Sequence, residues 1–299
     1  MTYLLKLLLI SSLTYGAWAQ DLKPVQLAII IDDLGNSLNA GLNAIALPAD
    51  ITLAVMPHRK HSKLLAERAG RLGRDVLLHA PMSTVNKRFL GAGALDEQLS
   101  EEDFKRKLGF AIESIPYIKG VNNHMGSALT TNVQAMSWVM QVLKPKSLFF
   151  VDSRTSAASV GYATAQQMGL ASATRDIFLD NDITTEHIHQ QFKKAIAVAE
   201  QYGSAIAIGH PHAATINYLA HVLPQLQGTH VNVVKVSDLV KTNTPLRPHD
   251  ARERPAAIRP DLDAFVQELI KRNAPAAPLQ LTQLKTKPVT QPERTPSIN

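Results

Sequence analysis

Leu27-Ala28-Ile29-Ile30-Ile31-Asp32-Asp33 is the stretch that decides the fold, because five apolar residues in a row end on two acids. The same design recurs six more times, each short apolar run ending within a residue or two on a histidine or an aspartate. These six runs lie at 51–58, 76–79, 120–124, 148–152, 177–180 and 205–210. Buried parallel strands are continuous apolar runs, and a barrel of such strands has its active site at their C-terminal ends. The pattern therefore predicts a β/α barrel with a metal or acid–base site at one end.

The segments between these runs have the periodicity of amphipathic helices, and strands that alternate with helices imply parallel pairing through right-handed crossovers. The predicted helices are 62–72 with Leu64, Leu65, Ala69 and Leu72 on one face, a helix capped by Ser100, 133–143 capped by Thr131 or Asn132, and 186–202 capped by Thr184 or Thr185 and ended by Gly203. An eighth apolar run, 231–234, completes a predicted α/β fold of seven to eight parallel strands within residues 20–244, a length sufficient for a barrel.

Both ends of the chain differ from this body. Residues 1–19 carry one lysine, an apolar stretch and the ending Ala17-Trp18-Ala19, which predicts a secretory signal peptide. The alternative is a membrane anchor, for which the apolar part is short. Residues 245–299 are rich in Pro, Ala and Lys, which predicts a flexible tail with one short helix at 261–271.

Composition narrows the chemistry and the partners. The chain has no cysteine, which excludes disulfides, thiolate metal sites and a cysteine nucleophile, so a metal would be held by histidines and carboxylates. The formal net charge is +6, and half of it lies after residue 244. Residues 20–244 carry nearly equal numbers of positive and negative charges, which argues against nucleic acid as a partner. No segment after residue 19 has an apolar stretch long enough to predict an integral membrane protein. The basic tail is either solvated or contacts an envelope protein.

Five residues at the ends of the apolar runs are the strongest candidates for chemistry. Asp32 and Asp33 are neighbours, so their side chains leave the strand in different directions and can serve two roles, one as a metal ligand and one as a base. His79 and His124 each end a different run, and imidazole is a common zinc ligand. His210 follows a later run and suits a general acid. The alternative for the two acids is a solvated loop or a helix cap.

Further polar residues lie close to these positions in the sequence. Asp152 and Asp176 are candidates for orienting the histidines, with salt bridges or caps as the alternative. Asn123, Ser127 and Ser153 are candidates for lining a sugar site.

The motifs Ile-Asp-Asp at 31–33, His-Ala-Pro-Met at 79–82, Asn-Asn-His-Met-Gly-Ser at 122–127, Val-Asp-Ser at 151–153 and Ile-Gly-His-Pro-His at 208–212 resemble the divergent polysaccharide deacetylases. This family is a branch of the carbohydrate esterases, in the NodB-like deacetylase superfamily, and the resemblance covers roughly residues 25–243. It implies a distorted (β/α) barrel of the glycoside hydrolase/deacetylase type.

The resemblance also implies roles for individual residues. Asp32 corresponds to the general base, Asp33 to the metal-binding acid and His210 to the general acid. In the broader family the two metal histidines are four residues apart, but Ser83 stands four residues after His79, so the second ligand is assigned to His124. The Arg-Pro-Pro-Tyr-like element that assists the base in that family is absent from this sequence.

The sequence therefore predicts an exported, metal-dependent hydrolase that removes N-acetyl or O-acetyl groups from a cell-envelope glycan. Its cofactor would be Zn²⁺ or another divalent metal, and the signal without disulfides favours the bacterial periplasm. Two alternatives remain open: a catalytically inactive glycan-binding or envelope scaffold protein on the same barrel, and a different metal-dependent hydrolase.

Overall fold

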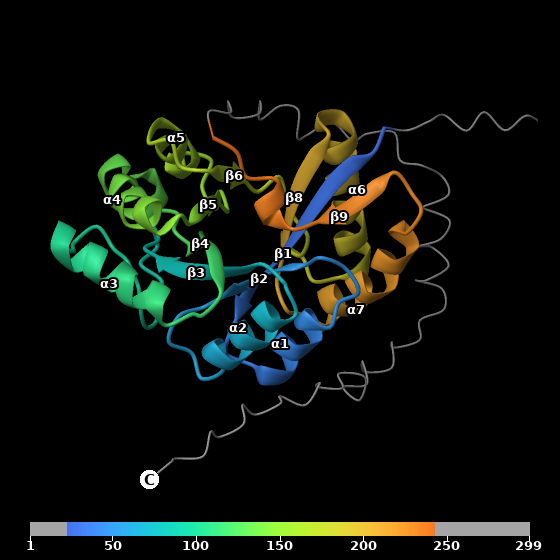
Figure 1. The fold of residues 1–299 in the computed structure, drawn as a ribbon, viewed down its shortest axis with the longest axis horizontal. Helices are drawn as coiled ribbons and strands as arrows, with labels where there is room; N and C mark the ends of the chain where they lie inside the picture. Colours follow the sequence, from blue (N-terminus) through green and yellow to red (C-terminus); the bar gives the residue numbers. More distant parts are fainter. Residues whose placement is uncertain (1–22, 243–299) are drawn as a thin grey trace, which may run out of the picture.

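The computed structural model describes residues 23–242, so the predicted signal peptide and the whole of the predicted tail, including the segment 261–271, lie outside the described residues. Strands and helices alternate along almost the whole of this range (Figure 1). The strands are β1 (Val25–Leu34), β2 (Thr52–Val55), β3 (Val76–Met82), β4 (Ile118–Met125), β5 (Phe149–Asp152), β6 (Ser172–Thr174), β7 (Ile177–Phe178), β8 (Ser204–Gly209) and β9 (Val231–Val234). The helices are α1 (Leu38–Ile45), α2 (Ser62–Arg71), α3 (Glu101–Glu113), α4 (Val133–Leu143), α5 (Gly161–Gln167), α6 (Thr185–Tyr202) and α7 (Ala213–Val222).

All pairings between these strands are parallel, and the sheet order is β6-β5-β4-β3-β2-β1-β8-β7, with β9 paired to β1. The two edge strands of this order, β6 and β7, are separated in sequence only by Arg175 and Asp176. The backbone N–H of Arg175 donates to Asp152 O of β5, and that of Asp176 donates to Ile206 O of β8. The sheet therefore curls until its edges meet, which confirms the predicted distorted barrel; the three-residue strand β6 was not predicted.

Alternate side chains of the strands pack into two separate cores. On β1, Ala28 and Ile30 belong to a small cluster inside the curled sheet, whereas Leu27, Ile29 and Ile31 belong to the larger cluster between the sheet and the helices. The helices lie around the outside of the sheet (Figure 1). This two-residue alternation is a property of any β-strand, and here it decides which polar side chains point into the barrel.

Several helix boundaries agree with the sequence predictions. The side chains of Ser100, Asn132 and Thr184 each accept a hydrogen bond from a first-turn N–H, so they cap α3, α4 and α6. The last of these helices ends at Gly203, whose φ of 82° is in the left-handed region.

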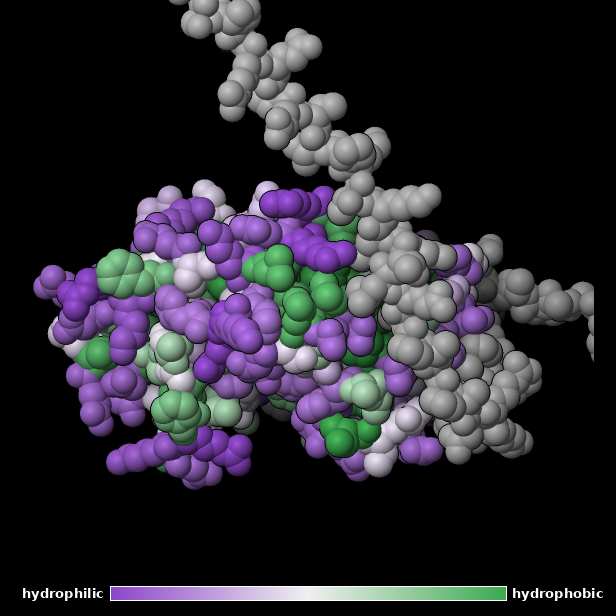
Figure 2. Space-filling model, turned by 90° about the horizontal axis from the view of Figure 1, so that it is seen from below, coloured by the Kyte–Doolittle hydropathy of each residue, from purple (hydrophilic) through white to green (hydrophobic). Residues whose placement is uncertain are grey.

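The predicted apolar face of α2 is only half right. Leu65 and Ala69 are buried as expected, but Leu64 and Leu72 are about half exposed. Leu65, Ala66 and Ala69 form the buried stripe, Leu64 lies beside it and Leu72 follows the end of the helix. Viewed from the side of α1 and α2, the surface is mostly hydrophilic, with hydrophobic patches between the polar side chains (Figure 2).

Gly120 at the start of β4 allows the close approach of β5. A Cβ atom at this position would lie 2.7 Å from the backbone oxygen of Phe149 and would clash with its ring. We expect Gly120→Ala to lower the free energy of unfolding by about 1–3 kcal/mol because the strands must separate. The measurement is urea denaturation followed by circular dichroism.

The matched control is Gly109→Ala in the middle of α3, where an added Cβ meets nothing within 4 Å. There we expect a gain of about 0.5–1 kcal/mol from helix propensity. Equal effects of the two substitutions would contradict this account of the β4–β5 contact.

Candidate functional site

The polar residues at the C-terminal ends of the strands continue the inward-facing positions of those strands. Asp32 follows Ala28 and Ile30 in the two-residue alternation of β1, and His79 follows Leu77 on β3, all within or beside the inner cluster. His210 follows Ile206 and Ile208 of β8 in the same way. The inward-facing positions are thus apolar in the middle of these strands and polar at their C-terminal ends.

Asp33 reaches the same interior through a break in the alternation. The pairing of β1 with β2 shifts register between Ile31 and Leu34, and Asp33 has a φ of 57°. This left-handed conformation is uncommon outside glycine, although Asp tolerates it better than most residues. Because of it, two neighbouring carboxylates face one site instead of opposite sides of the sheet.

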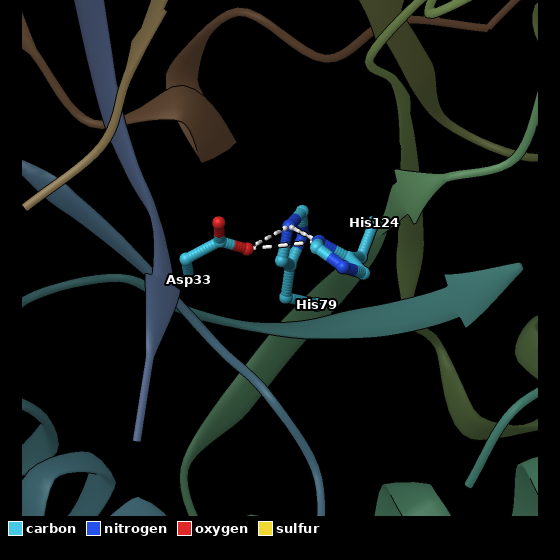
Figure 3. Close-up of side chains that lie close together, drawn as sticks. All are labelled: Asp33, His79 and His124. Atoms are coloured by element: carbon cyan, nitrogen blue, oxygen red, sulfur yellow. Dashed lines mark hydrogen bonds and ion pairs between the residues drawn. The ribbon is translucent and has the colours of Figure 1, made fainter. Parts of the chain in front are cut away.

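Asp33, His79 and His124 bring three potential metal ligands together (Figure 3). Asp33 Oδ1 lies 2.8 Å from His124 Nδ1 and 3.2 Å from His79 Nε2, and these two nitrogens are 3.2 Å apart. The register explains the meeting, because His79 is paired with Asn122, so His124 lies two residues further along the same face of β4.

This donor set fits a divalent metal. Two imidazoles and one carboxylate are the ligand type of catalytic zinc, and ligands about 2.0–2.1 Å from a tetrahedral ion lie about 3.3 Å from one another. Asp33 Oδ1 is buried and accepts no well-aligned hydrogen bond, so it is an oxygen that a cation would satisfy.

The electrostatics of the cluster also favour a cation. Burial by itself raises the pKa of Asp33, but the adjacent His124 and His79 lower it far below its ordinary value. Burial opposes the charged form of His79, yet the charges of Asp32 and Asp33 raise its pKa. The space between these side chains therefore stabilises positive charge, carried by a proton or by a metal ion.

Asn122 connects the candidate base to a candidate ligand. Its Nδ2 donates to Asp32 Oδ1 at 2.8 Å, and its Oδ1 lies 2.9 Å from His79 Nδ1. Since a carboxamide oxygen only accepts, His79 Nδ1 is the donor, which leaves Nε2 directed at Asp33. Asn122 is fully buried. One side chain thus orients the His79 ring and holds the Asp32 carboxylate.

Asp32 is buried and lies beside this group, with its Oδ2 3.6 Å from His79 Nε2. Burial raises the pKa of Asp32, while the positive charges of His79 and His210 and the hydrogen bond from Asn122 counteract part of that rise. A carboxylate with a raised pKa is a stronger base than an exposed one.

His210 is held from behind by Asp180. Its Nδ1 donates to Asp180 Oδ1 at 2.8 Å, and its backbone N–H and the Thr215 hydroxyl donate to Oδ2. Burial opposes the charge of His210, but Asp180, followed by the more distant Asp32 and Asp33, raises its pKa to about 9. His210 therefore faces the same cluster and is protonated at neutral pH.

An aromatic stack supports the same imidazole. The Phe178 ring stacks on His210 with centroids 6.2 Å apart, and the Arg175 guanidinium lies 3.7 Å above the Phe178 ring. Arg175 in turn donates from Nε to Ser153 O and from a terminal nitrogen to Arg154 O. The stack therefore fixes the His210 ring from the side.

The structure gives other places to the remaining sequence candidates. The Asp152 carboxylate accepts from the backbone N–H groups of Arg154 and Tyr162 and from the Ser159 hydroxyl, so it organises the loop before α5 and its partners are not histidines. Asp176 Oδ2 accepts from the backbone N–H of Ile206, between strands.

Asn123 is also directed away from the cluster. It is bonded to Met125 O and to the backbone N–H of Ser153, because it occupies the outward position of β4 next to inward Asn122. Ser153 Oγ accepts a 3.4 Å bond from Asn122 behind the cluster, and Ser127 Oγ accepts from Val85 N.

Sequence reasoning missed Asn122 and Asp180 as functional residues. Asp180 ends its apolar run just as His210 does, and Asn122 precedes His124 by two residues, the spacing that puts both on one face. Alternation counted from the apolar run was the available signal, and it also places Asn123 and Asp152 at outward-facing positions of their strands.

A protein-family model described as divergent polysaccharide deacetylase matches residues 29–240. The chain belongs to this family. The protein YibQ of Escherichia coli K12 is 37% identical over 225 residues, which cover 74% of this chain and 70% of YibQ. A Haemophilus influenzae protein is 39% identical over 194 residues, covering 65% of this chain and 69% of that protein.

The fold is shared with a crystal structure of an uncharacterized Agrobacterium tumefaciens C58 protein, at a TM-score of 0.70 and 23% identity, covering 73% of this chain and 90% of that one. Among residues 23–242, no helix has the length and apolar character that crossing a membrane requires.

Asn122 offers a test of the site's architecture. We expect Asn122→Ala to weaken metal binding by about 10–100-fold, since the loss of a residue that orients a metal ligand has this effect. We also expect a loss of about 1–3 kcal/mol in unfolding free energy, because Asp32 and His79 lose a buried partner. Metal titration and urea denaturation measure the two effects.

Asn217→Ala, an exposed asparagine of α7, is the control and should change neither quantity. Wild-type metal affinity in Asn122→Ala would show that this amide does not orient His79.

Proposed function

We propose that the protein is an exported, metal-dependent carbohydrate deacetylase that hydrolyses N-acetyl or O-acetyl groups of a cell-envelope glycan. The observation that carries this proposal is the grouping of one carboxylate and two imidazoles, 2.8–3.2 Å apart, beside a second, buried carboxylate. Membership of the family supports a carbohydrate substrate.

Asp33, His79 and His124 are the residues that would hold the metal, with zinc as the ion that best suits this donor set. When bound, a divalent metal at this position supplies Lewis-acid polarisation of the acetyl carbonyl and acidifies a water molecule.

Asp32 is the proposed general base. Asn122 holds Asp32 Oδ1, which leaves Oδ2 on the side of His79 Nε2. Because burial raises its pKa, the carboxylate accepts a proton readily from the water that attacks the acetyl carbon.

His210 is the proposed general acid. Its Nδ1 is engaged by Asp180, so only Nε2 is available to give a proton to the departing amine or hydroxyl group of the sugar. Since its pKa is raised to about 9, the donor is charged and ready at neutral pH. In this proposal Asp32 takes up a proton and His210 gives one, which are the two roles that acid–base catalysis requires.

Export is proposed from the sequence of residues 1–19, and a periplasmic location from that signal together with the absence of cysteine. The first experiment is metal analysis of protein purified without chelator, followed by acetate release from acetylated glycans. One zinc per chain with acetate release supports the proposal. A protein that neither contains nor takes up zinc contradicts it and favours an inactive glycan-binding barrel.

Two substitutions separate metal binding from catalysis. We expect Asp32→Asn to retain the metal and to lower turnover by about 10²–10⁴-fold, the usual contribution of a general base. We expect His124→Ala to lose both metal and turnover. Metal content and acetate release are the measurements.

His221→Ala, an exposed histidine of α7, is the matched control and should behave as wild type. Acetate release by Asp32→Asn at the wild-type rate would make the base assignment wrong.

Asp180→Asn tests the support of His210. We expect a decrease in turnover of up to about 10⁴-fold, as when the aspartate that holds a catalytic histidine becomes an amide. Metal content should stay at one equivalent at the Asp33 site, because Asp180 contributes no ligand to that trio. Asp182→Asn, an exposed neighbour in the same loop, is the control. An unchanged kcat in Asp180→Asn would remove Asp180 from the mechanism.

A further inference from the structure

A second group of ligand atoms lies beside the first. Within residues 23–242, Asp180, His210 and His212 each offer one donor atom, and these atoms lie within 4.8 Å of one another. We propose that this group is a second, weaker zinc site that is distinct from the trio of Asp33, His79 and His124.

The chain geometry brings the two imidazoles together. His210 and His212 are separated only by Pro211, whose ring fixes its backbone φ, and their ring centroids are 5.9 Å apart at an interplanar angle of 45°. Asp180 Oδ1 lies 2.8 Å from His210 Nδ1, so carboxylate and imidazole are already in contact. Two histidines and one carboxylate are a ligand set that zinc prefers.

His212 has no structural role that explains its place. It occupies the N-cap position of α7, where Ser, Thr, Asp or Asn would stabilise the helix, and its side chain makes no capping hydrogen bond. The residue is exposed, so a metal bound here would keep open coordination positions towards solvent. The side chain is thus free to act as a ligand.

Three features make this site weaker than the first. A zinc ion must displace the proton that His210 shares with Asp180, and the raised pKa of His210 shows that this proton is firmly held. The Asp180 carboxylate already accepts two other hydrogen bonds. The N-terminus of α7 is also the positive end of the helix dipole, which disfavours a cation.

Occupation of the second site would inhibit the reaction. A zinc ion on His210 would displace the proton that Nδ1 shares with Asp180 and break the hydrogen bond that orients the ring, so excess zinc would reduce turnover. This consequence rests on the proposed function, whereas the binding of a second ion does not.

The test is a calorimetric titration of the metal-stripped full chain with Zn²⁺. Wild type should bind two equivalents with different affinities. His212→Asn should keep the tight equivalent and weaken the other by at least about 100-fold, since even the loss of a residue behind a ligand costs 10–100-fold. Asparagine is a good N-cap residue, so this substitution removes the imidazole without weakening the start of α7.

His124→Ala should show the reverse, with loss of the tight equivalent and retention of the weak one. His221→Ala, on the same helix, should bind both. A single equivalent in wild type, or a second equivalent with unchanged affinity in His212→Asn, would overturn the proposal. Two equivalents together with an absence of acetate release would leave this site standing and reject the deacetylase function.

Discussion

The alternation of side chains along the strands is the constraint on which the rest of this structure depends. Inward positions hold apolar residues along most of the barrel and then, in the same register, Asp32, Asn122 and His210 at its carboxyl end. Outward positions pack against the helices. One slip of register would exchange the two sets, burying the site residues under the helices and placing large aliphatic side chains at the mouth. The packing of the core therefore fixes the site.

Two imidazole–carboxylate pairs lie at the C-terminal end of the barrel, and each stabilises a different positive charge. Asp33 and His79 surround a place that stabilises a cation, whereas Asp180 stabilises a proton on His210. Asp32 lies between them, where burial raises its pKa and the nearby positive charges restrain that rise. Such divergent environments for similar groups are typical of acid–base catalysis.

The two imidazoles of the candidate metal site come from two neighbouring strands. The position four residues after His79 is Ser83, and the second imidazole comes instead from the neighbouring strand β4. A candidate ligand on a strand is positioned by backbone pairing, since His124 is registered opposite Pro81 of β3. The same pairing puts Asn122 opposite His79. One strand, β4, therefore supplies both the candidate ligand His124 and the amide that orients His79.

The sequence by itself determined the parallel barrel and the strand ends at which Asp32, Asp33, His79, His124 and His210 lie, because apolar runs and their endings are local properties of the chain. Even Asn122 and Asp180 could have been found by counting alternation from those runs. Only the tertiary structure decided that Asp33 turns inward through a positive φ, that Asp152 serves a loop, and that Asp180 approaches His210. These facts depend on register between strands distant in sequence and on a backbone conformation that local pattern does not encode.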